Sequence, residues 1–278
     1  MKRIISLAAA LFLLLSITAF ANTATFENGG DNRFKSIRLT PEIYNHSNMN
    51  LSDLRIRDEL GEYVPFFIHN HAETPRDEGY FVEEFAPSFS VEETERRTLI
   101  HIKDLRNIRL SSITIDTDSV FQRTVRSPFL NPQELYNLTF NDATHSNTTL
   151  QYFGQTPDGE IFTLSIYNGD DRPININGIA VRYYTDELVF EGGGSAYFTL
   201  HFSGERSLQA PVYDIARRRS EILRGEIDGL ELREIVFAEP IELEPLPERD
   251  FTMIFNIAVI AVAILLALLI LLKLKKKS

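Results

Sequence analysis

Two histidines, His69 and His71, are separated by one residue at the end of an apolar run. Residues two apart in a strand point to the same face, so both imidazoles could bind one metal ion. A metal centre needs a third and a fourth ligand, and nothing in the sequence marks them. We therefore interpret the pair as surface histidines and expect neither a metal nor another cofactor.

Four aspartates lie in predicted turns, Asp116 with Asp118 and Asp170 with Asp171. Either pair could bind calcium together with backbone carbonyl oxygens. A turn rich in aspartate also forms without an ion, because the side chain hydrogen-bonds to the local backbone. The sequence leaves calcium binding open.

Adjacent glutamates, Glu83-Glu84 and Glu92-Glu93, could hydrolyse a glycoside only if two carboxyl groups faced each other across a cleft. Neighbouring acids on an acidic surface are usually just hydrated. No serine lies in a Gly-x-Ser-x-Gly elbow, there is no cysteine, and the glycine run 192–194 lacks the lysine of a phosphate loop. We expect no catalytic residue, and hence no enzyme.

Aromatic residues offer a different kind of site. The chain has 20 Phe and 10 Tyr but no Trp, the side chain that sugar-binding surfaces favour most for stacking. Tyrosines could take that role, and Tyr184 and Tyr197 are the candidate ligand-binding residues. Alternation assigns the neighbouring Tyr183 to a core.

Both ends of the chain are apolar. Residues 1–21 have a basic start, an apolar stretch and the small-x-small sequence Ala19-Phe20-Ala21, which predicts a cleavable signal peptide. Residues 251–272 carry no charge, and a helix of that length would be roughly 33 Å long, enough to cross a bilayer. Four lysines in the tail 273–278 predict a cytoplasmic C-terminus. A sortase signal is the alternative, but residues 246–250 lack its threonine and glycine.

Charge is distributed unevenly between these segments. Residues 22–250 hold 22 basic and all 39 acidic side chains, which gives the exported part a net charge of −17. Such a surface argues against nucleic acid and anionic lipid headgroups as partners. The absence of cysteine means that no disulfide stabilises the fold.

Between the ends, short segments alternate apolar and polar residues, as antiparallel strands do. The alternating segments are 54–57, 113–116, 162–166, 179–183 and 198–202. Turn sequences with glycine, asparagine and aspartate separate them. We predict a mainly β protein of antiparallel β-sandwich or jelly-roll domains.

Helical spacing occurs once, from about Asp214 to Arg224, and predicts one short amphipathic helix before a last strand at 230–237. The expected domains are an N-terminal β domain at 22–92, a jelly roll at 93–185, and strands plus helix at 186–238. The third part could pack with the first as one interrupted domain. A stalk rich in proline and glutamate follows at 239–250.

Several motifs resemble known proteins. Residues 37–44 and 51–65 are similar to the start of an uncharacterised family of bacterial envelope proteins that have a signal peptide and a C-terminal span. Residues 113–116 with 121–126, and 171–179, resemble strands of galactose-binding-like (discoidin-type) jelly rolls, and 210–216 resembles the region after them. This resemblance implies a fold more than a function, because that fold hosts sugar binders, lipid binders and scaffolds. The usual serine-glycine-tryptophan stretch is replaced here by residues 127–131, beginning Ser-Pro-Phe.

Together these features predict a single-span protein of the bacterial inner membrane with its N-terminal region exported. The exported β domains would serve as a protein-interaction or assembly module, with the bilayer and a membrane-protein partner of the envelope as contacts. A carbohydrate- or peptidoglycan-binding module is the first alternative. A membrane-tethered hydrolase is the second.

The first prediction concerns topology. A protease added outside spheroplasts should digest the chain up to about Asp250 and leave a small fragment with the lysine tail, because only the span and tail would be shielded. Immunoblotting with tags at either side of the span measures this. Protection of residues 22–250 in intact spheroplasts would contradict the prediction.

Overall fold

A computed structural model describes residues 22–70, 81–141, 143–204 and 208–238. The predicted signal peptide, stalk, span and tail lie outside these residues. No helix within the described ranges is long and apolar enough to cross a membrane.

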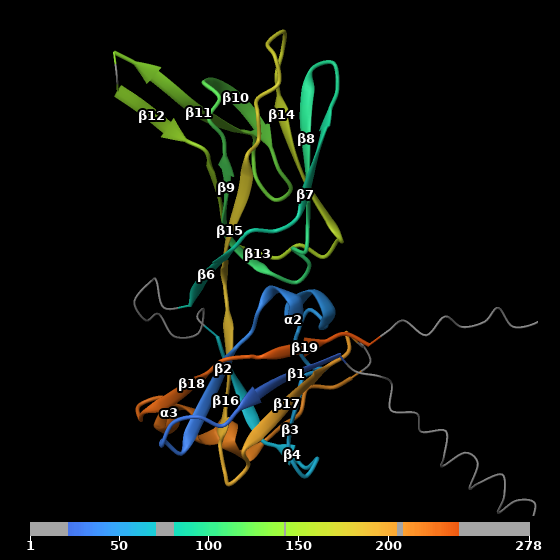
Figure 1. Cartoon of the computed structure of the whole chain (residues 1–278), viewed down its shortest axis with the longest axis vertical. Helices are drawn as coiled ribbons and strands as arrows, with labels where there is room; N and C mark the ends of the chain where they lie inside the picture. Colours follow the sequence, from blue (N-terminus) through green and yellow to red (C-terminus); the bar gives the residue numbers. More distant parts are fainter. Residues whose placement is uncertain (1–21, 71–80, 142, 205–207, 239–278) are drawn as a thin grey trace, which may run out of the picture. The chain divides into compact units, whose positions relative to one another are not determined.

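The described part of the chain is mainly β, with 52% of its residues in strands and 7% in helices (Figure 1). The predicted fold class is confirmed at this level, since the sheets are almost entirely antiparallel and form a sandwich-like arrangement compatible with a jelly roll. The one parallel pair among the described strands joins β18 (Ile227–Leu230) to β2 (Phe34–Arg38).

Two sheets are built from residues before 71 and after 185, and we term them the terminal sheets. Their strand orders are β19-β1-β17-β3-β4 and β18-β2-β16-β5. The strands are β1 (Asn22–Glu27), β2 (Phe34–Arg38), β3 (Arg55–Asp58), β4 (Tyr63–Val64), β5 (Phe66–Asn70), β16 (Asp186–Glu191), β17 (Tyr197–Phe202), β18 (Ile227–Leu230) and β19 (Glu234–Val236).

Two further sheets, the central sheets, come from the chain between them. Their orders are β12-β11-β10-β14-β8-β7 and β13-β9-β15-β6. The strands are β6 (Val82–Phe85), β7 (Phe89–Glu93), β8 (Arg97–Lys103), β9 (Arg109–Asp116), β10 (Phe121–Arg126), β11 (Gln133–Phe140), β12 (Ala143–Asn147), β13 (Thr149–Gln155), β14 (Ile161–Tyr167) and β15 (Gly178–Tyr184).

These pairings bear on how the chain is divided. Strands β1 and β2 pair with β17 and β16, so segments far apart in sequence share the terminal sheets. Strand β6 and all but the last residue of β7 fall inside the predicted domain 22–92, but these strands pair with β15 and β8 of the central sheets. The chain therefore passes from the terminal to the central sheets between β5 and β6, and it returns to the terminal sheets at Thr185. The predicted domain limits stay a prediction.

Alternation explains most of the strands. In β14 the side chains of Phe162, Leu164 and Ile166 are buried and those between them are at least partly exposed, and β17 repeats this pattern. Strand β16 differs, because its first five residues are all buried. It is flanked by β2 and β5, and both of its faces are covered.

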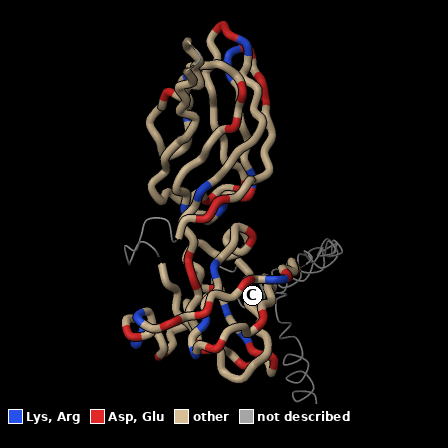
Figure 2. Tube along the Cα trace, turned by 60° about the vertical axis from the view of Figure 1, so that its left-hand side comes forward, with Lys and Arg blue, Asp and Glu red and all other residues tan. Residues whose placement is uncertain are grey.

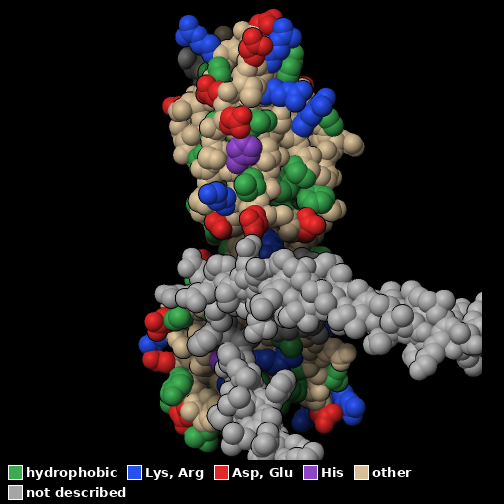
Figure 3. All heavy atoms as spheres, turned by 90° about the vertical axis from the view of Figure 1, so that its right-hand side faces the viewer, with side chains coloured by type: hydrophobic (Ala, Val, Ile, Leu, Met, Phe, Trp, Pro, Cys, Tyr) green, Lys and Arg blue, Asp and Glu red, His purple; other side chains and the backbone are tan. Residues whose placement is uncertain are grey.

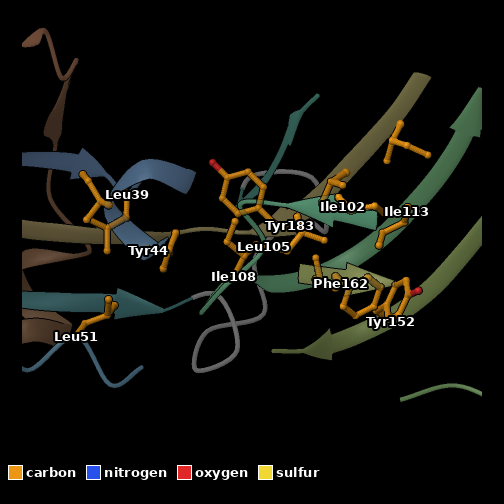
Figure 4. Packing of buried hydrophobic residues seen from close by; sticks show 14 of the residues in the cluster. Leu39, Tyr44, Leu51, Ile102, Leu105, Ile108, Ile113, Tyr152, Phe162 and Tyr183 are labelled. Atoms are coloured by element: carbon orange, nitrogen blue, oxygen red, sulfur yellow. The ribbon is translucent and has the colours of Figure 1, made fainter. Parts of the chain in front are cut away.

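The buried apolar side chains form one large cluster that extends across both groups of sheets. Figure 4 shows Tyr44 near Leu105, Ile108 and Tyr183, which belong to the central part of the chain. The rings of Tyr44 and Tyr183 meet edge to face with centroids 6.2 Å apart. A second, small cluster forms around Phe67, Val189 and Ile222.

The helices correct the prediction of a single amphipathic helix at Asp214–Arg224. That segment forms a 3-10 helix, η2 (Asp214–Arg218), followed by one α-helical turn, α3 (Arg219–Ile222). Another helix, α2 (Pro41–His46), was not predicted. It starts with proline, whose fixed φ suits a first helical position, and it is too short to show a helical repeat.

The predicted last strand at 230–237 is wrong as a single element. Leu230 ends β18, which pairs with β2, and Glu234–Val236 forms β19, which pairs with β1 in the other terminal sheet. The chain therefore moves from one sheet to the other within four residues, too few for the sequence pattern to show.

Acidic positions are spread over both groups of sheets rather than gathered in one patch (Figure 2). On the face shown in Figure 3, acidic and basic side chains and a histidine are interspersed with a few hydrophobic side chains over the central sheets. This distribution agrees with a hydrated acidic surface.

Candidate functional site

Two consecutive carboxylates, Asp186 and Glu187, begin strand β16 and are buried, with 2% and 6% of their surface exposed. Neighbouring residues in a strand point to opposite faces, so the two side chains enter different surroundings. Burying a carboxylate costs several kcal/mol unless it is paired and hydrogen-bonded. The partners of these two acids therefore define the polar centre of the fold.

Glu187 contacts a cation on one side and an imidazole on the other. Its Oε1 is 3.4 Å from Nε of Arg38, and its Oε2 is 3.4 Å from Nδ1 of His69. Nη1 of Arg38 also donates to Oε1 of Glu83 at 2.6 Å. The ring of His69 meets that of Phe81 edge to face at 5.0 Å. The arrangement links β2, β5, β6 and β16.

This group opens onto a hollow of about 870 Å³, which we call the junction hollow. Arg38, Glu83 and Glu187 line it together with apolar side chains from both groups of sheets, among them Tyr183 and Leu232. Its volume is within the range of sites that bind small molecules.

Asp186 has a phenol as its main partner. The hydroxyl of Tyr44 donates to Oδ2 of Asp186 at 2.9 Å and accepts the backbone N–H of the same residue at 2.7 Å. Burial, with a smaller contribution from the charge of Asp186, raises the pKa of Tyr44 well above its usual value, so the hydroxyl keeps its proton. Nη2 of Arg109 lies 3.6 Å from Oδ1 of Asp186.

Further hydrogen bonds tie the terminal and central sheets together around these acids. The hydroxyl of Thr185 donates to the carbonyl of Leu39 at 2.8 Å, and its N–H donates to the carbonyl of Phe81 at 2.8 Å. The side-chain amide of Asn107 donates to the carbonyl oxygens of Tyr44 and Ser47. Because these groups are buried, each bond also avoids the cost of an unpaired polar group.

The junction hollow brings two carboxylates close together, the arrangement on which a hydrolase depends. Both Glu83 and Glu187, however, bind the same guanidinium of Arg38, which occupies the place between them that a scissile bond would need. The geometry is that of an ion-pair network. It supports the hydrolase alternative less well than a binding or scaffolding role.

The structure describes only some of the residues considered for metals. His69 is buried against Glu187, whereas His71 lies outside the described residues. Asp171 forms an ion pair of 2.9 Å with Arg123, and the neighbouring Asp170 is exposed. Within the described residues no group of three or more potential metal-binding side chains gathers at one point.

The two candidate tyrosines lie on different sheets. Tyr184 ends β15 in a central sheet, and Tyr197 begins β17 in a terminal sheet. Tyr197 is 48% exposed and lines a hollow of about 450 Å³ with Glu27 and Arg233. Tyr183 is buried, as alternation predicts.

Sequence reasoning missed the polar centre itself. Asp186 and Glu187 precede the apolar run Leu188–Phe190, which is typical of a strand with both faces covered. Acidic residues in such a strand are buried and need hydrogen-bonding or cationic partners, so this pattern could have indicated the site. Nothing in the sequence identifies Tyr44 and Arg38 as those partners, because they are about 140 or more residues away.

This polar centre generates a prediction on stability. Tyr44→Phe should lower the free energy of unfolding by about 1–3 kcal/mol, because Asp186 would lose its buried hydroxyl partner. Thermal and urea unfolding of residues 22–245 measure it. Tyr183→Phe is the matched control, since that ring contributes mainly packing against Tyr44 and Phe85. Equal losses in both variants would contradict a special role for the Tyr44 hydroxyl.

Comparisons of the chain with protein-family models, with curated proteins and with solved structures find no match. The likeness to bacterial envelope proteins therefore depends on the short motifs quoted above.

Proposed function

We propose that this chain is a membrane-anchored, exported β-sandwich protein of the bacterial inner membrane that acts as a protein-interaction or assembly module without catalytic activity. Three sequence features support this location: the predicted signal peptide at 1–21, the uncharged segment 251–272 and the lysine tail. In this proposal the C-terminus is cytoplasmic, and residues 22–250 contact other proteins of the envelope.

One observation carries the proposal. The described residues bury several ionisable side chains, and these bind partners within the chain: Lys35, Asp53, His69, Asp186 and Glu187. Lys35 donates to Asp228 at 2.7 Å and to two backbone carbonyls. The buried charges therefore stabilise the fold, and a partner protein would bind to the exposed surface or to the open edges of the sheets.

A second candidate is glycan binding, and the exposed ring of Tyr197 favours it. The ring lies beside an ion pair between Arg233 and Glu27, with N···O 2.5 Å apart. An aromatic face next to charged hydrogen-bonding groups is a combination that can bind a sugar. The absence of tryptophan and the separation of Tyr184 from Tyr197 make this the weaker proposal.

Photo-crosslinking in native membranes tests the leading proposal. A photoreactive amino acid at Phe153, which is 82% exposed, or at Tyr197 should trap discrete envelope proteins, because an assembly module contacts them through its surface. Replacing residues 251–272 by an unrelated apolar helix should keep export but change the products, if the span packs specifically. Mass spectrometry identifies the products. The absence of any protein product at both positions would refute the proposal.

Retention on cell-wall polysaccharide tests the second candidate. We expect residues 22–245 to pass through without retention. If they bind, Tyr197→Ala should weaken retention by about 1–2 kcal/mol, the effect of losing an aromatic contact, and Tyr184→Ala is the comparison on the other group of sheets. Retention that depends on either tyrosine would promote glycan binding to the leading function.

A further inference from the structure

Strand β12 (Ala143–Asn147) is one of the two outer strands of the six-stranded central sheet, and each of its five residues is exposed. It pairs with β11 on one side in an unbroken register from Tyr136↔Asn147 to Phe140↔Ala143. In Figure 1 the hairpin of β11 and β12 lies at the outer end of this sheet. The other side of β12 has no strand beside it in the described residues.

The other outer strands of the four sheets carry features that prevent pairing with another chain. Charged residues, a bulge, burial or short length each protect an edge. Glutamates lie in β6, β7 and β19, an aspartate lies in β18, β13 has a break in register, β5 is largely buried, and β4 has two residues. Strand β12, with the sequence Ala-Thr-His-Ser-Asn, has none of these features.

We propose that β12 pairs with β12 of a second copy of this chain, antiparallel and about a two-fold axis at His145. This deepens the assembly role and depends on that proposed function, since anchoring in one membrane raises the local concentration of the copies. The partner surface is the same strand, so the contact is closed and symmetric.

Hydrogen-bond geometry sets the register. Strands β11 and β12 end on the pair Phe140↔Ala143, whose members are three positions apart in sequence, and the terminal pair of such a tight hairpin exchanges both hydrogen bonds. Hydrogen-bonded and non-hydrogen-bonded pairs then alternate along β12, so the backbone N–H and C=O groups of Thr144 and Ser146 point away from β11. A two-fold axis at His145 brings Thr144 opposite Ser146 of the second copy, and all of these outward groups find partners.

Charge limits where a second copy can dock. Residues 22–250 carry a net charge of −17, so two copies repel each other over most of their surfaces. They can approach at β12, where the symmetric register sets no carboxylate or cationic side chain of Lys or Arg opposite another. An extended segment of a different protein is the other occupant that the experiment distinguishes.

Single cysteines in the full-length, membrane-bound protein test the register, because the natural chain has no cysteine. In His145→Cys the two cysteines would form a non-bonded pair with Cα atoms about 4.5 Å apart, which suits a disulfide. In Thr144→Cys they would be roughly 8 Å apart and unable to bridge. Mixed Thr144→Cys and Ser146→Cys copies should form a heterodimer.

We expect a covalent dimer from His145→Cys on mild oxidation and none from Thr144→Cys alone. Adding Thr144→Pro to His145→Cys should abolish the dimer, since it removes an outward N–H while leaving the bonds to β11 intact. Ser90→Cys, on the exposed β7 at the opposite edge, is the control for random collision.

A monomer from His145→Cys, or equal dimer from His145→Cys, Thr144→Cys and Ser90→Cys, would overturn the proposal. The photo-crosslinking products distinguish self-pairing through β12 from the assembly role itself. Heterologous products without the His145 dimer would refute self-pairing alone, and the absence of both would refute the assembly role as well.

Discussion

The burial of two consecutive carboxylates at the start of β16 is the constraint on which the rest of this structure depends. Asp186 and Glu187 cannot be stable there without the phenol of Tyr44 and the guanidinium of Arg38. Those partners belong to the first fifty residues of the chain, and Arg109 and Glu83 belong to the central sheets. Satisfying the two acids therefore requires three distant segments to be in place at once.

Apolar clustering and the polar network act at the same place. The rings of Tyr44 and Tyr183 pack together, and the hydroxyl of Tyr44 reaches Asp186. Apolar contact supplies most of the free energy, because it grows with the area removed from water. The hydrogen bonds contribute less net energy but are directional, so they select one register between the strands that meet there.

The sequence predicts what depends on local periodicity and misses what depends on distant partners. Alternation identifies β14 and β17 and assigns Tyr183 to the core. It cannot show which strands become neighbours, since β1 pairs with β17 across some 180 residues. The hollow lined by Arg38 and Glu83 follows from such pairings, and so does the exposed position of β12. Helix α2 is missed for another reason, because six residues are too few to establish a period.

The order of strands along the chain has a consequence for how the protein acquires its structure. Strands β6 to β15 follow one another in sequence, so their sheets can close before the rest of the chain has been synthesised. The terminal sheets must wait for β16 to β19, because β1 and β2 have no complete partners before then. Pairing β5 with β16 closes a loop that contains β6 to β15. The entropy cost of closing this loop is small once β6 to β15 have folded, because the two ends of the loop are then held close together. Until that moment β1 and β2 present unpaired edges, so the interval before residue 186 has been synthesised is the stage most exposed to misassembly.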